Sequence, residues 1–251
     1  MKNNENEKLS SYNKIVVTFL ILALVISIFN QFQLMSMRSG KDNIIPTGVA
    51  FAEASIVPTG TPKIYGKELG VSYDDVSPNN PELADQTIEV LANLDKTITL
   101  TGADLDRYID ITSEMSCEYC CGASSIIVRR EDVDAMDKKI EAAIASGAVS
   151  KEQAEKYRQT AGDPACGCAH SYAMRGLAKY LITEHNDEFS DKEILEELAK
   201  WKTLFFPGQL TSKAAVLKEK NIEFSYINLA SNRYRGIEQG ATAGSGMVGG
   251  C

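Results

Sequence analysis

The sequence has no excess of basic charge and lacks two common catalytic signatures. Its 251 residues contain 26 Lys and Arg against 34 Asp and Glu, which gives a formal net charge of −8. Nucleic-acid binding needs a basic surface, so we expect no nucleic-acid partner. The chain also contains no Gly-x-Ser-x-Gly nucleophile elbow and no Gly-Lys-Ser/Thr phosphate loop. It therefore lacks the usual sequence marks of a serine hydrolase and of a P-loop protein.

An uncharged, mostly apolar run at residues 15–32 follows a short polar N-terminus. About 18–20 helical residues cross a hydrocarbon core of roughly 30 Å. Large residues follow the run, and the first small-x-small site, at residues 50–52, lies too far on for signal-peptide cleavage. Three lysines precede the run, whereas only Arg38 and Lys41 follow it closely, a bias that favours a cytoplasmic N-terminus. We predict a retained single-pass anchor in the cell membrane, with the soluble domain on the extracytoplasmic side.

The rest of the chain divides by composition. Residues 1–14 form the predicted cytoplasmic tail, and residues 33–85 carry two Pro-Thr-Gly turns and further prolines that predict an extended linker. Regular patterning marks residues 86–228 as a soluble domain that contains most of the cysteines. Residues 229–251 are rich in glycine towards their end and predict a flexible tail that ends in Cys251.

Helical patterns dominate the predicted domain. Thr101 is a candidate N-cap, and the pairs Ser150/Gln153 and Ser190/Glu193 have the spacing of capping boxes. The second of these helices carries the apolar stripe around Trp201 and should stop at Pro207-Gly208, before a last helix that begins near Thr211 and ends near Lys220. Ser124 to Val128 is short and β-branched, which favours a strand. The predicted fold is mainly α with a small β element: one N-terminal transmembrane helix plus one soluble α-rich domain.

The six cysteines are concentrated in two short motifs and one terminal position: Cys117, Cys120 and Cys121; Cys166 and Cys168; and Cys251. A Cys-x-x-Cys turn and an extended Cys-x-Cys each direct two sulfur atoms to one side. Four thiolates suit a soft or borderline ion such as copper or zinc, with an iron–sulfur cluster less favoured. Cys121 and His170 are alternative ligands.

The second motif allows another geometry. Asp163-Pro164 has the pattern of an N-cap followed by proline at the first helical position. A helix that begins there would place Cys166, His170 and Met174 on one stripe and Cys166 at a helix N-terminus, which lowers a thiol pKa. The sequence does not choose between the two geometries.

Two other uses of the cysteines stay open. Outside the cytoplasm, cysteines normally pair, and each disulfide adds roughly 2–4 kcal/mol of stability. Cys117 and Cys120 also have the spacing of a redox pair, although no βαβ pattern surrounds them. The alternatives to metal binding are therefore a disulfide-stapled surface protein and a membrane-tethered thiol–disulfide or iron–sulfur redox protein.

The segment from Asp163 to His170 (DPACGCAH) resembles the bacterial extracytoplasmic proteins named for a Pro-Cys-Tyr-Cys-Gly-Cys motif. That family shares a membrane-proximal N-terminus and a Cys-Gly-Cys followed closely by histidine. Here Ala165 follows the proline and the motif's first cysteine is absent. We expect a non-enzymatic, membrane-anchored metal-binding protein, whose predicted ligands are Cys117, Cys120, Cys121, Cys166, Cys168 and His170. The sequence names no protein partner.

Overall fold

The computed structural model describes residues 56–239 and 247–249, and these residues are mainly helical. Their helices are α3 (Gly66–Leu69), η1 (Tyr73–Asp75), α4 (Pro81–Thr97), α5 (Gly102–Ser113), α6 (Arg130–Ala145), α7 (Lys151–Glu155), α8 (Ala169–Glu184), α9 (Asp191–Phe205), α10 (Pro207–Glu219), α11 (Tyr226–Ala230) and η2 (Asn232–Tyr234). No helix in these ranges is long and apolar enough to cross a membrane. The predicted anchor at residues 15–32, the predicted tail at 1–14 and Cys251 lie outside the described residues.

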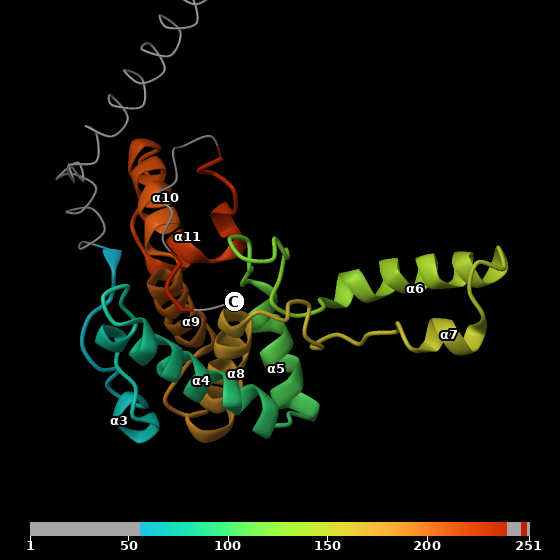
Figure 1. Ribbon diagram of the computed structural model, residues 1–251, viewed down its shortest axis with the longest axis horizontal. Helices are drawn as coiled ribbons and strands as arrows, with labels where there is room; N and C mark the ends of the chain where they lie inside the picture. The colour runs from blue at the N-terminus through green and yellow to red at the C-terminus, as the bar shows by residue number, and fades with distance from the viewer. Residues whose placement is uncertain (1–55, 240–246, 250–251) are drawn as a thin grey trace, which may run out of the picture. The chain divides into compact units, whose positions relative to one another are not determined.

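Helix α8 is the centre of the domain. It packs against α4, α5 and α9 (Figure 1), and most of its side chains are buried. A helix that is buried on nearly every side belongs to a core rather than to an amphipathic surface. Gly176 lets α4 approach closely, because a Cβ atom there would lie 2.0 Å from the carbonyl oxygen of Leu91. The absence of a side chain at this position therefore sets the α4–α8 contact.

The predicted linker is wrong over residues 56–85, which contain α3, η1 and the start of α4. Tyr65 and Tyr73 are buried, and both hydroxyls donate hydrogen bonds to the Glu197 carboxylate on α9, at 2.7 and 2.5 Å. Trp201 Nε1 donates to the Tyr65 hydroxyl at 2.7 Å. The proline and glycine turns thus shape a segment that covers α9. The residues that pair lie more than a hundred positions apart, so local sequence did not reveal the contact.

The predicted tail is also wrong over part of its range. Leu229, Ala230 and Ser231 are fully buried, and Val248 is nearly so. Asn232 N donates to the Glu114 carbonyl oxygen at 2.7 Å, which fastens this region to the end of α5. The described residues 229–239 and 247–249 therefore belong to the folded domain.

The helix ends show how far local signals reach. Both predicted capping boxes are confirmed, at the start of α7 and of α9. The predicted start near Thr211 is wrong, because α10 begins at Pro207, which occupies the first helical turn and needs no amide hydrogen there. The strand predicted over 124–128 is wrong as well: β structure in the described residues is limited to two isolated bridges, Cys117 with Ala123 and Ile127 with Pro164.

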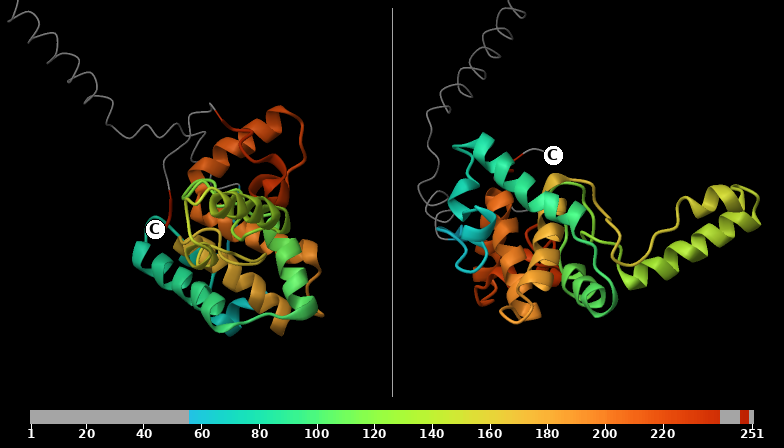
Figure 2. Two further views of the ribbon diagram at one scale, coloured as in Figure 1. Left: turned by 90° about the vertical axis from the view of Figure 1, so that its right-hand side faces the viewer. Right: turned by 90° about the horizontal axis from the view of Figure 1, so that it is seen from below.

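Helices α6 and α7 form an arm that stands apart from the other helices (Figures 1 and 2). They pack on each other, and α6 has no fully buried residue. At the base of the arm, Arg130 binds Asp106 at 2.7 Å and also binds Asp110, both on α5. The arm is inserted between the two cysteine motifs in the sequence.

Candidate functional site

A short antiparallel pairing at the base of the arm brings the two cysteine motifs together. We call residues 126–128 and 162–165 the base ladder. Val128 N donates to Asp163 O at 2.8 Å, Gly162 N to Val128 O at 2.9 Å, and Ala165 N to Ile126 O at 3.2 Å. The chain therefore leaves the body, forms the arm and returns alongside its own path. This return explains how cysteines 45 positions apart meet.

The first motif is a tight turn. Gly122 N donates to Cys117 O at 3.0 Å, and Gly122 has φ +71°, a left-handed conformation that glycine adopts without strain. Cys117 then pairs with Ala123 in an antiparallel bridge. The turn folds Cys117 to Cys121 back on itself, so that the buried Cys117 lies inside the cluster and Cys121 on its exposed side.

The second motif lies at the N-terminus of α8, and the alternative in which a helix begins directly after Asp163 does not form. Asp163 accepts a hydrogen bond from Thr160 N at 2.7 Å, and Pro164 pairs with Ile127 in the base ladder. The helix begins at Ala169 with Cys168 as its N-cap, whose Sγ accepts from Ser171 N at 3.4 Å. Cys168, not Cys166, is therefore the cysteine at the helix N-terminus. The predicted stripe of Cys166, His170 and Met174 does not form.

Cys117 and Cys168 form the thiol pair of the site. Their Sγ atoms lie 3.1 Å apart and are not joined by a disulfide. The hydrogen bond from Cys117, assisted by those from His170 and Ser171 N, lowers the pKa of Cys168 to about 4 against desolvation. The same hydrogen bond and burial raise the pKa of Cys117 well above its usual range. At neutral pH the pair is one thiolate that accepts a hydrogen bond from one thiol.

The other three described cysteines surround this pair. Cys121 and Cys166 form a disulfide, which we call the surface disulfide because Cys121 is exposed, and the sulfur of Cys120 is also in a disulfide. Two groups of three sulfurs lie within 4.8 Å of one another: Cys117, Cys120 and Cys168; and Cys117, Cys121 and Cys166. Such groups of cysteines are close enough together to hold a metal ion or to exchange disulfides. Cys117 belongs to both groups.

His170, the sixth predicted ligand, is buried beside the cluster. Its Nε2 lies 2.8 Å from the Val248 carbonyl oxygen, and its ring packs on Phe205 and Phe206 with centroids 4.7 and 5.0 Å away. It also bonds to Cys168, as that residue's lowered pKa reflects. The structure thus brings all five described cysteines and His170 into one region, as the sequence predicted. In this conformation Cys121 and Cys166 are bonded to each other.

A buried charge cluster adjoins the site, and the sequence analysis missed it. Glu118 accepts a hydrogen bond from Lys202 Nζ at 3.1 Å, lies 3.8 Å from Lys213 Nζ and lies 3.4 Å from Arg235 Nε. Burial lowers the pKa of Lys202 to about 8, although Glu118 opposes this shift. Lys202 directly follows Trp201 in a helix with many apolar residues. A lysine at such a position is the sequence feature that could have predicted a buried, paired charge. The cluster holds the first cysteine motif against α9 and α10.

Arg175 fixes the second motif. Its guanidinium is fully buried, donates to Asp95 at 2.9 Å and, through Nη1, donates to the carbonyl oxygens of Ile126 and Cys166 at 3.2 and 3.0 Å. One side chain therefore binds Ile126 in the base ladder and Cys166, the residue that directly follows the ladder. The buried ion pair thus adjoins the backbone that carries Cys166.

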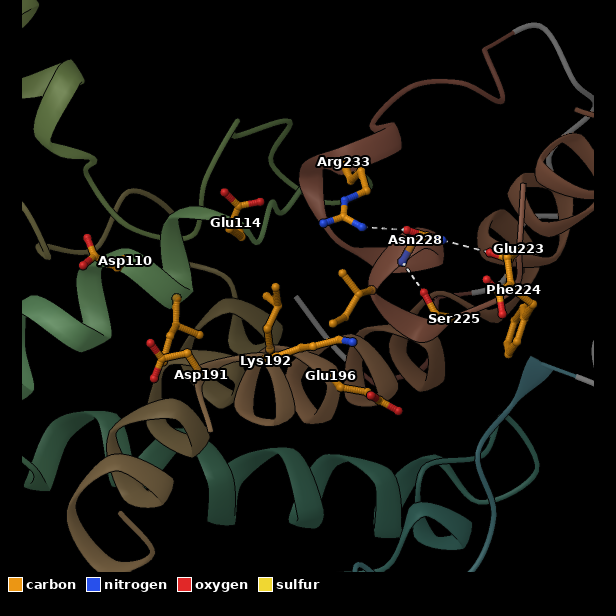
Figure 3. Close-up of a pocket in the computed structure, with 13 residues that line it drawn as sticks. Asp110, Glu114, Asp191, Lys192, Glu196, Glu223, Phe224, Ser225, Asn228 and Arg233 are labelled. Atoms are coloured by element: carbon orange, nitrogen blue, oxygen red, sulfur yellow. Dashed lines mark hydrogen bonds between the residues drawn. The ribbon is translucent and has the colours of Figure 1, made fainter. Parts of the chain in front are cut away.

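A groove lies away from the cysteines, between α5, α9 and the segment at residues 223–233 (Figure 3). This groove has a volume of about 640 Å³ and more acidic than basic side chains. Asn228 orders one wall: its amide donates to the Glu223 carbonyl oxygen at 2.9 Å and its side-chain oxygen accepts from Arg233 at 3.2 Å. No cysteine lines it, so the groove is separate from the thiol site.

Comparison of the chain with protein-family models, with curated proteins and with solved structures found no match.

Proposed function

We propose that the cysteine cluster is a thiol–disulfide relay. The thiol pair of Cys117 and Cys168 stores two electrons, and the surface disulfide passes them to an external disulfide through the exposed Cys121. The observation that carries this proposal is the position of Cys117, whose sulfur is 3.1 Å from Cys168 and within 4.8 Å of both sulfurs of the surface disulfide. A thiolate attacks a disulfide sulfur directly, so this proximity is what exchange requires.

The internal exchange conserves atoms and electrons. Cys168 first takes the proton of Cys117 along their hydrogen bond. Cys117 then attacks one sulfur of the surface disulfide, and the other sulfur leaves as a thiolate, which takes the proton from Cys168. The Cys168 thiolate next attacks Cys117 and displaces the second sulfur, which leaves a Cys117–Cys168 disulfide with one thiol and one thiolate at Cys121 and Cys166.

The external exchange returns the protein to its starting arrangement at the surface. The Cys121 thiolate attacks a partner disulfide and displaces one partner thiol. Cys166 then attacks Cys121, restores the surface disulfide and releases the second partner thiol. In total the partner disulfide gains two electrons and two protons: the thiol pair supplies both electrons and one proton, because it starts as one thiol and one thiolate, and water supplies the second proton.

The relay is tested by whether oxidation of the thiol pair requires the surface disulfide. Full-length protein with a reduced thiol pair is mixed with a small-molecule disulfide, and the redox state of each cysteine is read by differential alkylation and tandem mass spectrometry. We expect rapid oxidation of Cys117 and Cys168 in the natural chain and loss of the fast phase in a Cys121→Ser/Cys166→Ser double variant. A Cys120→Ser variant is the matched control and should keep the fast phase. Equal rates in the natural chain and the double variant, with unchanged circular dichroism, would overturn the relay.

A second candidate is binding of a soft metal ion such as copper or zinc. The three sulfurs of Cys117, Cys120 and Cys168 favour it, because thiolates select soft ions when they converge. The thiolate of Cys168 would bind first, and Cys120 and Cys166 join the ligand set only when reduced. Elemental analysis of protein purified without chelator tests this candidate. Metal content far below one equivalent in both the oxidised and the reduced protein would refute it.

The cellular setting is part of the same proposal. Residues 15–32 would anchor the chain in the membrane with the domain outside the cytoplasm, where disulfides persist. Membrane fractionation and protease protection of whole cells test this location, and recovery of the chain in the soluble cytoplasmic fraction would contradict it.

A further inference from the structure

Arg235 lies at the surface beside Cys121, the cysteine at which the proposed relay meets an external disulfide. Its Nη2 donates to the carbonyl oxygen of Gly122 at 2.9 Å, and Gly122 directly follows Cys121 in the exposed part of the first motif. The side chain of Arg235 is 35% exposed. The guanidinium thus combines a fixed contact with the turn that carries Cys121 and a face that is open to solvent.

The backbone that leads to Arg235 is fastened on both sides of the first motif. Asn232 N donates to the Glu114 carbonyl oxygen at 2.7 Å, and Asn232 Nδ2 donates to the carbonyl oxygens of Ser113 and Ser124, both at 2.9 Å. Ser113 and Glu114 precede the motif in the sequence, whereas Ser124 follows it. Helix η2 ends directly before Arg235. The arginine is therefore held against the exposed turn by backbone that is itself bound to both flanks of that turn.

The charge of Arg235 is only partly compensated. Its Nε lies 3.4 Å from Glu118, but that carboxylate also accepts a hydrogen bond from Lys202 at 3.1 Å and lies 3.8 Å from Lys213. Glu238 adds a second carboxylate near Lys213, so three cations face two carboxylates. Within the described residues, no hydrogen bond uses Nη1 of Arg235. A guanidinium with N–H donors to spare is a ready partner for a carboxylate, because its planar fork matches the two carboxylate oxygens.

We infer that Arg235 selects the external disulfide of the relay, and that the preferred substrates are disulfides with a carboxylate close to their sulfur atoms. The inference rests on the proposed relay for the identity of the reaction. Attack by the Cys121 thiolate breaks the S–S bond of the substrate, forms a mixed disulfide and releases the other half as a thiolate. Arg235 binds the carboxylate and so holds the S–S bond next to Cys121. A chain with a net charge of −8 repels anions over most of its surface, and a cation at this place attracts them where they react.

The test measures the first external step alone. In a full-length Cys166→Ser background, the mixed disulfide at Cys121 is not resolved by Cys166. Reduced protein, freed of reductant, is mixed with dithiodipropionate, which carries carboxylates, with cystamine, which carries ammonium groups, or with the neutral hydroxyethyl disulfide. The initial rate of adduct formation at Cys121 is read by tandem mass spectrometry. The ratio of this rate with and without Arg235→Gln removes the intrinsic reactivity of each compound.

We expect Arg235→Gln to slow the reaction of dithiodipropionate about 1.5- to 5-fold and to accelerate that of cystamine by a similar factor, as for an exposed charge pair. The rate with hydroxyethyl disulfide should not change. Arg235→Lys keeps the charge and should restore the order of rates, and about 1 M salt should abolish it. Arg233→Gln is the matched control: Arg233 is also exposed, but it donates to Asn228 on the groove, so its loss should leave all three rates unchanged.

Equal effects of Arg235→Gln on all three disulfides would show that Arg235 only supports the fold, and would overturn the inference. A disulfide peptide with glutamate beside its cysteine is compared with dithiodipropionate, and the compound with the larger factor indicates whether a protein segment or a small molecule is the source of the carboxylate. Adduct formation at Cys121 does not require the thiol pair. Charge selection without oxidation of Cys117 and Cys168 would therefore refute the relay alone, and oxidation of that pair without charge selection would refute the role of Arg235 alone.

Discussion

Replacement of Cys117 by alanine should raise the pKa of Cys168. The Cys117 thiol is the hydrogen-bond donor that contributes most to the low pKa of Cys168, about 4. A hydrogen bond to a charged group is worth about 1.5–3 kcal/mol, and one pKa unit corresponds to about 1.4 kcal/mol. We therefore expect a rise of roughly 1–2 units in Cys117→Ala. The Ser171 amide and His170 stay in place, so the pKa should remain below that of a free cysteine.

The assay is the rate of Cys168 alkylation as a function of pH, with the modified residue identified by mass spectrometry. Only the thiolate reacts, so in the natural chain the rate should hold as the pH falls and decline only near the lowered pKa of about 4. In Cys117→Ala the decline should begin at higher pH.

Cys117→Ser is the matched control for this experiment. A hydroxyl can still donate to Cys168, so this variant should titrate close to the natural chain. The reasoning fails if alanine and serine variants titrate together, or if Cys168 in the natural chain titrates like an ordinary thiol.

Three further predictions concern the free energy of unfolding, measured by urea denaturation. Arg175→Met leaves Lys179 as the remaining cation on the buried Asp95 carboxylate and removes the hydrogen bonds to Ile126 and Cys166, so it should lower this free energy by about 2–4 kcal/mol. A loss below about 1 kcal/mol would contradict the role of this ion pair. Gly176→Ala forces a backbone oxygen of α4 to move and should lower the free energy of unfolding by about 1–3 kcal/mol. Gly167 has open space around it, so Gly167→Ala should change this free energy little. Equal effects of the two substitutions would refute the close approach of α4 to α8 at Gly176. The disulfide between Cys121 and Cys166 joins residues 45 positions apart, so its loss in Cys121→Ser/Cys166→Ser should lower the free energy of unfolding by roughly 4 kcal/mol. An unchanged urea midpoint would contradict this stabilising role of the disulfide.

The sequence predicts those parts of the fold that local signals determine. The capping boxes at Ser150 and Ser190 are satisfied within four residues, so their helices could be placed from the sequence. The segment at residues 56–85 could not, because Tyr65 and Tyr73 owe their positions to Glu197, which is distant in the chain. Proline and glycine turns look alike in a linker and in a folded cover. Only the distant partner distinguishes them.

The composition of the candidate site was predicted, but its internal arrangement was not. Clustering alone indicated that Cys117 to Cys121 and Cys166 to His170 would meet. Which sulfur faces which depends on the register of the base ladder and on the residue that begins α8. Asp163 has the chemistry of an N-cap, yet it caps a turn instead, because the neighbouring proline is held in the ladder. Tertiary pairing overrode the local signal.

The long gap between the two motifs is a consequence of the arm and does not separate them in space. Helices α6 and α7 occupy the gap, and the base ladder closes it, so the distance in sequence has no bearing on the distance between sulfurs. Arg175 connects this architecture to the chemistry, since it donates to Ile126 in the ladder, to Cys166 directly after it and to Ser171 in the first turn of α8. Its loss should therefore disturb the thiol pair as well as the fold. Alkylation of Cys168 at acidic pH should fall in Arg175→Met under conditions where the variant is still folded, because the ladder and the helix N-terminus would no longer be held in one position.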